Sequence, residues 1–171
     1  MLQKKICMLG SFAVGKTSLV SRFVKSIYSD TYHTTIGVKI DKKQVTVGNE
    51  TINCILWDIA GEDEFYTINN NYLRGMSGFF LVVDGTRNAT LEVALNIYHR
   101  ITEELGELPF VVAINKSDLE GEWEINPHKL NELSDAGASI IHTSAKNGTG
   151  VEDAFHQIAM EMINHNGKKT S

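Results

Sequence analysis

The 171-residue sequence lacks a long hydrophobic run and has only two prolines and two cysteines. No apolar run approaches the roughly 18 residues that a membrane-spanning helix needs, so no such span is expected. Both cysteines, Cys7 and Cys54, lie in apolar runs that read as strands. This predicts buried, reduced thiols and a cytoplasmic protein. The six histidines show no metal-ligand spacing, so a Cys/His metal site is not expected.

The sequence also has no excess of positive charge, since its formal net charge is −5. This argues against general binding of nucleic acids or anionic membranes. The first ten residues lead directly into an apolar strand and show no secretory signal, and residues 166–171 contain no cysteine for prenylation. We therefore expect one domain over residues 1–165 and a short flexible polar tail at 166–171. Either the protein is not lipidated or its C-terminus is truncated here, so no membrane anchor is expected in this chain, and any membrane contact would be through partners.

What is present is a phosphate-binding pattern in KKICMLGSFAVGKTS, residues 4–18. An apolar run leads into Gly10, and Gly15-Lys16-Thr17 opens a segment with helical apolar spacing. Glycines at these positions permit backbone angles and close approaches that a Cβ would block, and amides at a helix N-terminus bind anions. Lys16 is placed to reach the β- and γ-phosphates of a nucleotide, and the Thr17 hydroxyl to hold Mg²⁺.

Strand-like and helix-like segments alternate along the rest of the chain. Strands are expected at 38–47, 51–59, 78–84, 109–115 and 138–143, and helices at 15–27, from 62, at 90–105, from 127 and at 151–163. The alternation predicts a parallel α/β sheet with helices on both faces. Asn126-Pro127 predicts a helix N-cap followed by proline in the first helical position.

The strands at 38–47 and 51–59 are expected to form an antiparallel hairpin around Gly48-Asn49. Apolar residues of the first strand change phase between Ile40 and Val45, which predicts a bulge or irregularity. Its lysines are typical of an edge strand protected against aggregation.

The second strand of the hairpin ends in Asp58, where a carboxylate beside a phosphate loop would reach Mg²⁺ directly or through water. Thr34 and Thr35 offer hydroxyls for a further Mg²⁺ contact. The acids of Glu62-Asp63-Glu64 suit a helix start, and the helix dipole alone would account for them.

A phosphate loop leaves ATPase, kinase and GTPase open, and Asn115-Lys116-Ser117-Asp118 decides among them. A carboxylate accepts two parallel hydrogen bonds from guanine, whereas adenine has no matching pair of donors. Asn115 would hold the loop or the base edge, and the stem of Lys116 would cover the ring. The motif therefore favours a guanine nucleotide.

In its ordered motifs the chain resembles a Ras-superfamily small GTPase, most closely the Rab branch. The match runs from Lys4 to about Ile163 through GSFAVGKT, TIGV, WDIAGE, YLRG, NKSD and SAK. The resemblance implies a G domain with a mostly parallel six-stranded sheet, one antiparallel edge strand and about five helices. It also implies GTP or GDP with Mg²⁺ as bound groups.

The resemblance further implies roles residue by residue. The nucleotide-binding set would be Ala13, Val14, Gly15, Lys16, Thr17, Ser18, Tyr28, Thr35, Gly61, Asn115, Lys116, Asp118, Ser144, Ala145 and Lys146. Thr17, Thr35 and Asp58 would hold the metal, and Lys16, Thr35, Gly61 and Glu62 would serve catalysis. Ile40, Trp57 and Tyr72 would form an apolar effector patch, although core packing also accounts for Trp57. Effectors, exchange factors and activators would bind through residues 30–40 and 60–74.

Two positions depart from the family pattern. Glu62 stands where the family usually has the glutamine that orients the attacking water, and a carboxylate cannot donate to the transferring phosphoryl group. Phe12 stands where a small residue is usual, so its ring would exclude water or an activator's arginine, or would pack outward on a switch. We expect slow intrinsic hydrolysis.

Three functions remain open from the sequence. The first is a slow GTP-hydrolysing switch, and the second is a GTP-dependent binding module with little or no hydrolysis. The third is a phosphate-loop kinase. Against the kinase, the four arginines (Arg22, Arg74, Arg87 and Arg100) are scattered and form no arginine-rich lid.

Overall fold

The computed structural model describes residues 2–25, 37–60 and 69–169, with side chains described up to residue 165. Six strands form one sheet in the order β2-β3-β1-β4-β5-β6. The elements in chain order are β1 (Leu2–Gly10), α1 (Lys16–Lys25), β2 (Val38–Val47), β3 (Glu50–Ile59), α2 (Asn70–Leu73), β4 (Gly78–Asp84), α3 (Asn88–Leu105), β5 (Phe110–Asn115), the 3₁₀ helix η1 (Ser117–Glu122), α4 (Pro127–Asp135), β6 (Ser139–His142) and α5 (Val151–Lys169).

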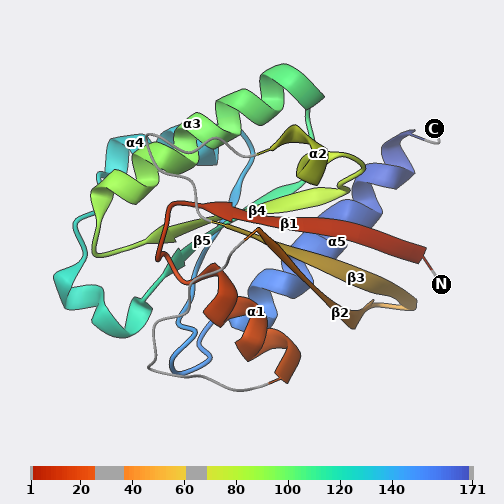
Figure 1. The fold of residues 1–171 in the computed structure, drawn as a ribbon, viewed down its shortest axis with the longest axis horizontal. Coiled ribbons are helices and arrows are strands. Elements are labelled where there is room, and N and C mark those ends of the chain that lie inside the picture. Colours follow the sequence, from red (N-terminus) through yellow and green to blue (C-terminus); the bar gives the residue numbers. More distant parts are fainter. Residues whose placement is uncertain (1, 26–36, 61–68, 170–171) are drawn as a thin grey trace.

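The sheet is parallel except at one edge. β3, β1, β4, β5 and β6 pair in parallel, and β2 pairs antiparallel with β3. In Figure 1, α1 and α5 cover one face of the sheet, while α3 and α4 cover the other. The predicted fold class is confirmed: a six-stranded, mostly parallel sheet with one antiparallel edge strand and flanking helices.

Two hydrophobic cores lie on the two faces of the sheet. Alternate residues of β1 supply both, since Ile6 and Met8 belong to the core under α1 and α5, and Cys7 and Leu9 to the core under α3. All residues of β4 and β5 are buried, as expected for parallel strands covered on both faces. The two cysteines are free and fully buried, which confirms the prediction of buried, reduced thiols.

The bulge predicted in β2 is wrong. Pairing with β3 is continuous from Val38 opposite Ile59 to Val47 opposite Glu50. Val38 packs against one core, whereas Val45 belongs to the other core and Val47 packs against it. The apolar phase changes because the two ends of the strand contact different cores, so no residue has to be inserted.

Helix boundaries shift at several places. α1 is described from Lys16 to Lys25, and the predicted helix end at Ile27 lies outside the described residues. The helix expected from Glu62 also falls mostly outside the described residues, with α2 at its end. The predicted N-cap of α4 is confirmed, because the Asn126 side chain accepts from the His128 amide (2.9 Å). α5 continues to Lys169, so residues 166–169, which the sequence placed in a polar tail, are helical.

Candidate nucleotide-binding site

The phosphate loop connects β1 to α1 at the carboxyl edge of the sheet, the edge at which ligands of such folds bind. Both loop glycines are required by their surroundings. Gly10 has φ 151°, and a Cβ there would lie 2.5 Å from the Val82 carbonyl oxygen. Gly15 has φ 102°, and a Cβ there would lie 2.3 Å from Asn115 Nδ2. The backbone can therefore pass close to β4 and β5 only with glycine at these positions.

Lys16 lies inside this loop and is only 6% exposed. Its ammonium donates to the carbonyl oxygens of Gly10 (3.2 Å) and Ser11 (3.0 Å). Burial lowers the pKa of Lys16 to about 8, against the opposing effect of the Asp58 charge. The ammonium is thus enclosed by the loop expected to bind phosphate, at a position where an anion would compensate its lost hydration.

Thr17 and Asp58 meet beside the loop. The Thr17 hydroxyl donates to Asp58 Oδ2 at 2.6 Å, and Asp58 is fully buried at the end of β3. A hydroxyl and a carboxylate are hard oxygen donors of the kind Mg²⁺ prefers. Within residues 2–25, 37–60 and 69–169, no group of three or more His, Cys, Asp or Glu side chains forms a metal cluster. The donor set fits Mg²⁺ held by few protein ligands together with nucleotide phosphates.

Asn115 at the end of β5 joins two parts of the site. Its Nδ2 donates to the Val14 carbonyl at 3.0 Å. Its Oδ1 accepts from the Thr143 hydroxyl (3.2 Å) and the Ala145 amide (3.3 Å). The side chain is 3% exposed. Of the two roles open from the sequence, holding the loop is the one for which this structure shows contacts.

The other residues expected at the guanine lie around the ends of β5 and β6. Asp118 is exposed on η1 and accepts from the Ser144 hydroxyl at 2.8 Å. Lys116 has a left-handed backbone (φ 71°), and its ammonium donates to Asp84 Oδ2 at 2.6 Å. The backbone carbonyls of Ala145 and Lys146 accept from Arg22 of α1, the first at 2.9 Å.

Several predicted site residues lie outside the described part of the chain. They are Tyr28, Thr34, Thr35, Gly61 and Glu62, together with the larger part of both expected switches. Of the two ranges expected to bind protein partners, the structure describes residues 37–40, residue 60 and residues 69–74. The roles of the residues outside these ranges stay predictions.

The expected effector patch is partly exposed. Ile40 is 49% exposed and lies opposite Trp57 in the β2–β3 register. The Lys5 ammonium lies 3.5 Å from the centroid of a Trp57 ring and donates to the Arg74 carbonyl at 2.8 Å. Trp57 and Tyr72 also pack against the core under α3, so core packing and an effector patch both remain accounts of Trp57.

Asp84, at the end of β4, is a further buried carboxylate that was not among the predicted site residues. This carboxylate is fully buried and accepts from the Thr86 amide (2.9 Å), the Thr86 hydroxyl (2.7 Å), Arg87 Nε (3.0 Å) and Lys116 Nζ (2.6 Å). Burial by itself would raise its pKa, but hydrogen bonds from Lys116, Thr86 and Arg87 lower the pKa overall. The signal was present, because Asp84 ends a buried strand just as Asp58 does.

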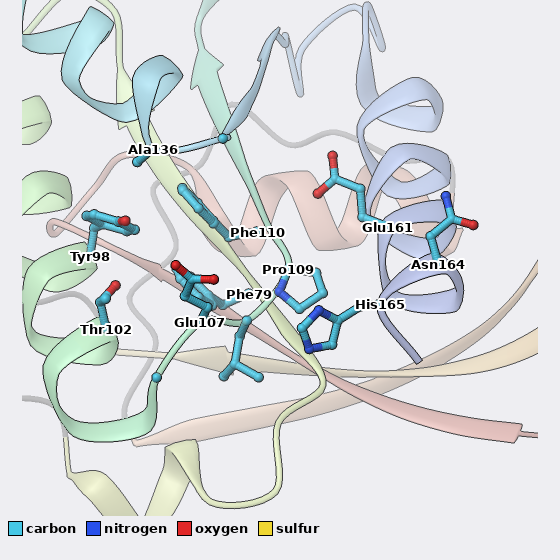
Figure 2. Close-up of a pocket in the computed structure, with 13 residues that line it drawn as sticks. Phe79, Tyr98, Thr102, Glu107, Pro109, Phe110, Ala136, Glu161, Asn164 and His165 are labelled. Atoms are coloured by element: carbon cyan, nitrogen blue, oxygen red, sulfur yellow. The ribbon is translucent and has the colours of Figure 1, made fainter. Parts of the chain in front are cut away.

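A cavity of about 370 Å³ lies at the amino ends of the strands, opposite the phosphate loop, where β4 and β5 begin. Figure 2 shows Tyr98, Phe110, Glu161 and His165 around it. Residues of the predicted nucleotide set are absent from its lining. The stacked rings at its base, Phe79 and Phe110, are 1% and 6% exposed. This cavity is separate from the phosphate loop.

The loop, the enclosed lysine and the Thr17–Asp58 pair at the carboxyl edge of a parallel sheet define a phosphate-loop nucleotide-binding protein. Comparison with known proteins narrows this class. The model of the Ras family matches residues 5–164. The chain is 32% identical to the Ras-related protein Rab-21 of Mus musculus over 161 residues, covering 93% of this chain and 72% of that protein.

Two further relatives give similar values. The chain is 31% identical to Rab-13 of Canis lupus familiaris over 98% of this chain and 83% of that protein. It is 29% identical to Rab-8B of Pongo abelii over 96% of this chain and 81% of that protein. The chain belongs to the Ras family and is a Rab-like small GTPase. Among its described residues, no helix is long and apolar enough to cross a membrane.

Proposed function

We propose that this protein is a GTP-binding molecular switch that hydrolyses GTP slowly and binds effector proteins in its GTP state. The observation that carries the proposal is the Asn115 bridge. One buried amide bonds the Val14 carbonyl of the phosphate loop and the Ala145 amide of the Ser144-Ala145-Lys146 segment. This bridge supports a single site in which the groups proposed to bind phosphate and those proposed to bind guanine are held together.

Guanine would be recognised by Asp118, whose carboxylate has the two acceptors that N1–H and the exocyclic amine require. The Lys116 stem would cover one face of the base and Tyr28 would lie across its edge. The Ala145 amide would meet guanine O6, and this amide now donates to Asn115. Adenine would leave the carboxylate without donors, so discrimination between GTP and ATP should be large.

The phosphates would bind the amides from Ala13 to Ser18, and Lys16 would exchange its loop carbonyls for phosphate oxygens. Bound Mg²⁺ would supply charge neutralisation between the β- and γ-phosphates. Thr17 and Asp58, which are in contact here, and Thr35 would hold it. The Gly61 amide would bond the γ-phosphate, which would order the two switches in the GTP state.

Slow hydrolysis is proposed from Glu62 and Phe12. Glu62 would accept from the attacking water but cannot donate to the phosphoryl group. Phe12 lies in the phosphate loop and is 47% exposed. This exposure supports the proposal that its ring would obstruct an activator's arginine. The patch of Ile40, Trp57 and Tyr72 would present apolar surface to an effector.

Single-turnover GTP hydrolysis with Mg²⁺, comparing the wild type with Glu62→Gln, tests this function. The rate scale of an unassisted Ras protein is on the order of 10⁻⁴ per second. A wild-type rate near that scale, with ATP untouched, would support a hydrolysing switch. If the wild type shows no measurable GTP hydrolysis and the Glu62→Gln variant hydrolyses GTP, the result would instead support the alternative, a GTP-dependent binding module. Hydrolysis of ATP at the same rate would contradict the assignment of guanine.

Phe12→Gly tests the steric part of the proposal. Removing the ring should make the protein more responsive to a Rab-type activating protein, because an inserted arginine would no longer meet a bulky side chain. The same single-turnover assay with and without activator measures it. An unchanged response would remove the steric argument and leave Glu62 as the only proposed cause.

A further inference from the structure

Arg87 connects the start of α3 to the phosphate loop. Its Nη2 donates to the Phe12 carbonyl oxygen at 2.9 Å, across 75 positions of sequence. Its Nε donates to Asp84 Oδ2 at 3.0 Å. One guanidinium therefore spans a loop carbonyl and a buried carboxylate, which its planar fork of donors permits and a lysine ammonium does not reproduce.

The carboxylate end of this bridge is fixed. Asp84 is fully buried and also accepts from the Thr86 amide, the Thr86 hydroxyl and Lys116 Nζ. The charge-assisted hydrogen bonds among these are the stronger kind. Because Asp84 holds both Arg87 and Lys116, the guanidinium reaches the loop from a rigid base that also supports the guanine motif.

The Arg87 side chain makes no capping hydrogen bond at the start of α3. The Thr90 hydroxyl donates to the Arg87 carbonyl (2.8 Å) and accepts from the Asp84 amide (2.9 Å). Arg87 itself occupies the N-cap position. The helix start is thus held by Thr90 and by the backbone, and the guanidinium is directed at Phe12.

The contact controls one particular peptide bond. The Phe12 carbonyl and the Ala13 amide belong to the same planar trans peptide, in which C=O and N–H point in opposite directions. Ala13 has φ 62°, a left-handed conformation that a non-glycine residue adopts only when its surroundings impose it. Fixing the carbonyl on Arg87 therefore fixes the direction of the Ala13 N–H.

We infer that Arg87 is a positioning residue for the phosphate loop, which holds the Ala13 amide in the direction required to bind a nucleotide phosphate. The inference rests on the proposed function, in which Ala13 is one of the phosphate-binding amides. The residue acts through the loop backbone, so its loss should weaken interactions with phosphate and leave recognition of the base unchanged.

The test is binding of four nucleotides to the wild type and to Arg87→Gln, Arg87→Lys and Arg100→Gln. The ratio of the affinities for GDP and GMP measures the contacts with phosphate. The ratio of the affinities for GDP and IDP measures the contact with the exocyclic amine of guanine. We expect Arg87→Gln to lower the GDP-to-GMP affinity ratio about tenfold, the scale of one hydrogen bond to a charged group, with the GDP-to-IDP ratio unchanged. Arg87→Lys should recover part of the loss. ADP, the fourth nucleotide, reports base selectivity.

Arg100→Gln is the matched control, because Arg100 lies on α3, which begins directly after Arg87, and contacts Glu104 (3.6 Å) and Asn70 instead of the loop. An unchanged GDP-to-GMP ratio in Arg87→Gln would overturn the inference. So would an equal fall in the GDP-to-IDP ratio, or an equal effect of Arg100→Gln, because these indicate general structural damage. If the wild type prefers ADP, the proposed function fails, and binding of inorganic pyrophosphate then decides the role of Arg87 by the same comparison.

Discussion

At the scale of single residues, Asn115 contributes to the stability of the fold, which its position in a nucleotide motif does not reveal. It is 3% exposed, and its side chain forms hydrogen bonds with the Val14 carbonyl, the Thr143 hydroxyl and the Ala145 amide. Asn115→Ala would leave these groups without partners, so we expect the free energy of unfolding of the nucleotide-free protein to fall by about 2–4 kcal/mol. Urea unfolding measures this change.

The matched control is Asn164→Ala, since Asn164 is exposed on α5. A surface change of this kind should stay within about 0.5 kcal/mol. Equal effects of the two substitutions would show that the Asn115 bridge contributes nothing particular to stability.

The burial of Lys16 predicts that the free energy of unfolding depends on pH, and it also determines the sign of this dependence. Its pKa falls from 10.5 to about 8 in the folded protein. Below pH 8 both states are protonated, so the penalty for burying the charge is fully present. Between about pH 8 and 10.5 the folded state binds fewer protons than the unfolded one, so stability should rise with pH. Relative to Lys16→Met, the wild type should gain up to about 3 kcal/mol over this window.

The comparison with Lys16→Met is needed because the thiols act in the opposite direction. Burial raises the pKa of Cys7 to about 12 and that of Cys54 to about 11. Their contribution is fully present below the unfolded value of 9.0 and is lost as the pH rises further. Urea unfolding at several pH values, with both cysteines kept in both proteins, cancels this effect. A difference between the proteins that does not vary with pH would contradict the lowered pKa of Lys16.

At the scale of secondary-structure elements, the α4 N-cap gives a test confined to one side chain. The Asn126 side-chain oxygen accepts from the His128 backbone amide at 2.9 Å, while the Asn126 backbone N–H donates to Asn88 Oδ1 at 2.8 Å. Asn126→Ala removes the first bond and keeps the second, so the loss should be about 1 kcal/mol. Thermal unfolding should show a decrease of about 2–4 °C in Tm. Asn126→Ser keeps a capping oxygen and should lose less, and equal losses would exclude a capping effect.

The elements that sequence predicted well are those whose signals are local. Gly15-Lys16-Thr17 announces a loop and a helix, Asn126-Pro127 a cap, and Gly48-Asn49 a hairpin, and the structure contains all three. The prediction of a bulge in β2 was wrong, because the alternation of apolar residues within one strand does not reveal that its two ends contact different cores. Strand identity could be predicted, but the packing on each face could not.

The contacts that sequence did not predict depend on which loops meet at the sheet edge. Arg87 is one of four scattered arginines in the sequence, and only the β1–β4 pairing brings it to Phe12. Asn115 opposes the Gly15 backbone because β5 lies beyond β4 in the sheet order. The chemical class of the site could therefore be inferred from motifs, whereas the network that holds the motifs together required the topology.

At the scale of the whole molecule, strand order brings the ends of β1, β3, β4 and β5 to one edge. β1 leads into the phosphate loop, β3 carries Asp58 and β5 carries Asn115, while Asp84 of β4 holds Lys116 and Arg87 beside them. The fold therefore predicts that nucleotide, metal and folding are thermodynamically linked. Ligand that binds only the folded state stabilises it, by about 2.7 kcal/mol at a hundredfold excess over Kd.

Thermal unfolding with GDP, with GDP and Mg²⁺, and with ADP and Mg²⁺ tests this linkage. We expect GDP to raise Tm, Mg²⁺ to raise it further, and ADP to leave it unchanged because Asp118 finds no donor pair on adenine. In Thr17→Ala the further rise with Mg²⁺ should be lost, since the hydroxyl that now contacts Asp58 is removed. Equal stabilisation by ADP would contradict guanine recognition, whereas a retained Mg²⁺ effect in Thr17→Ala would contradict only the proposed metal ligand. The assignment of guanine recognition and the assignment of the metal ligand can thus be contradicted separately, because the two groups of residues follow different strands.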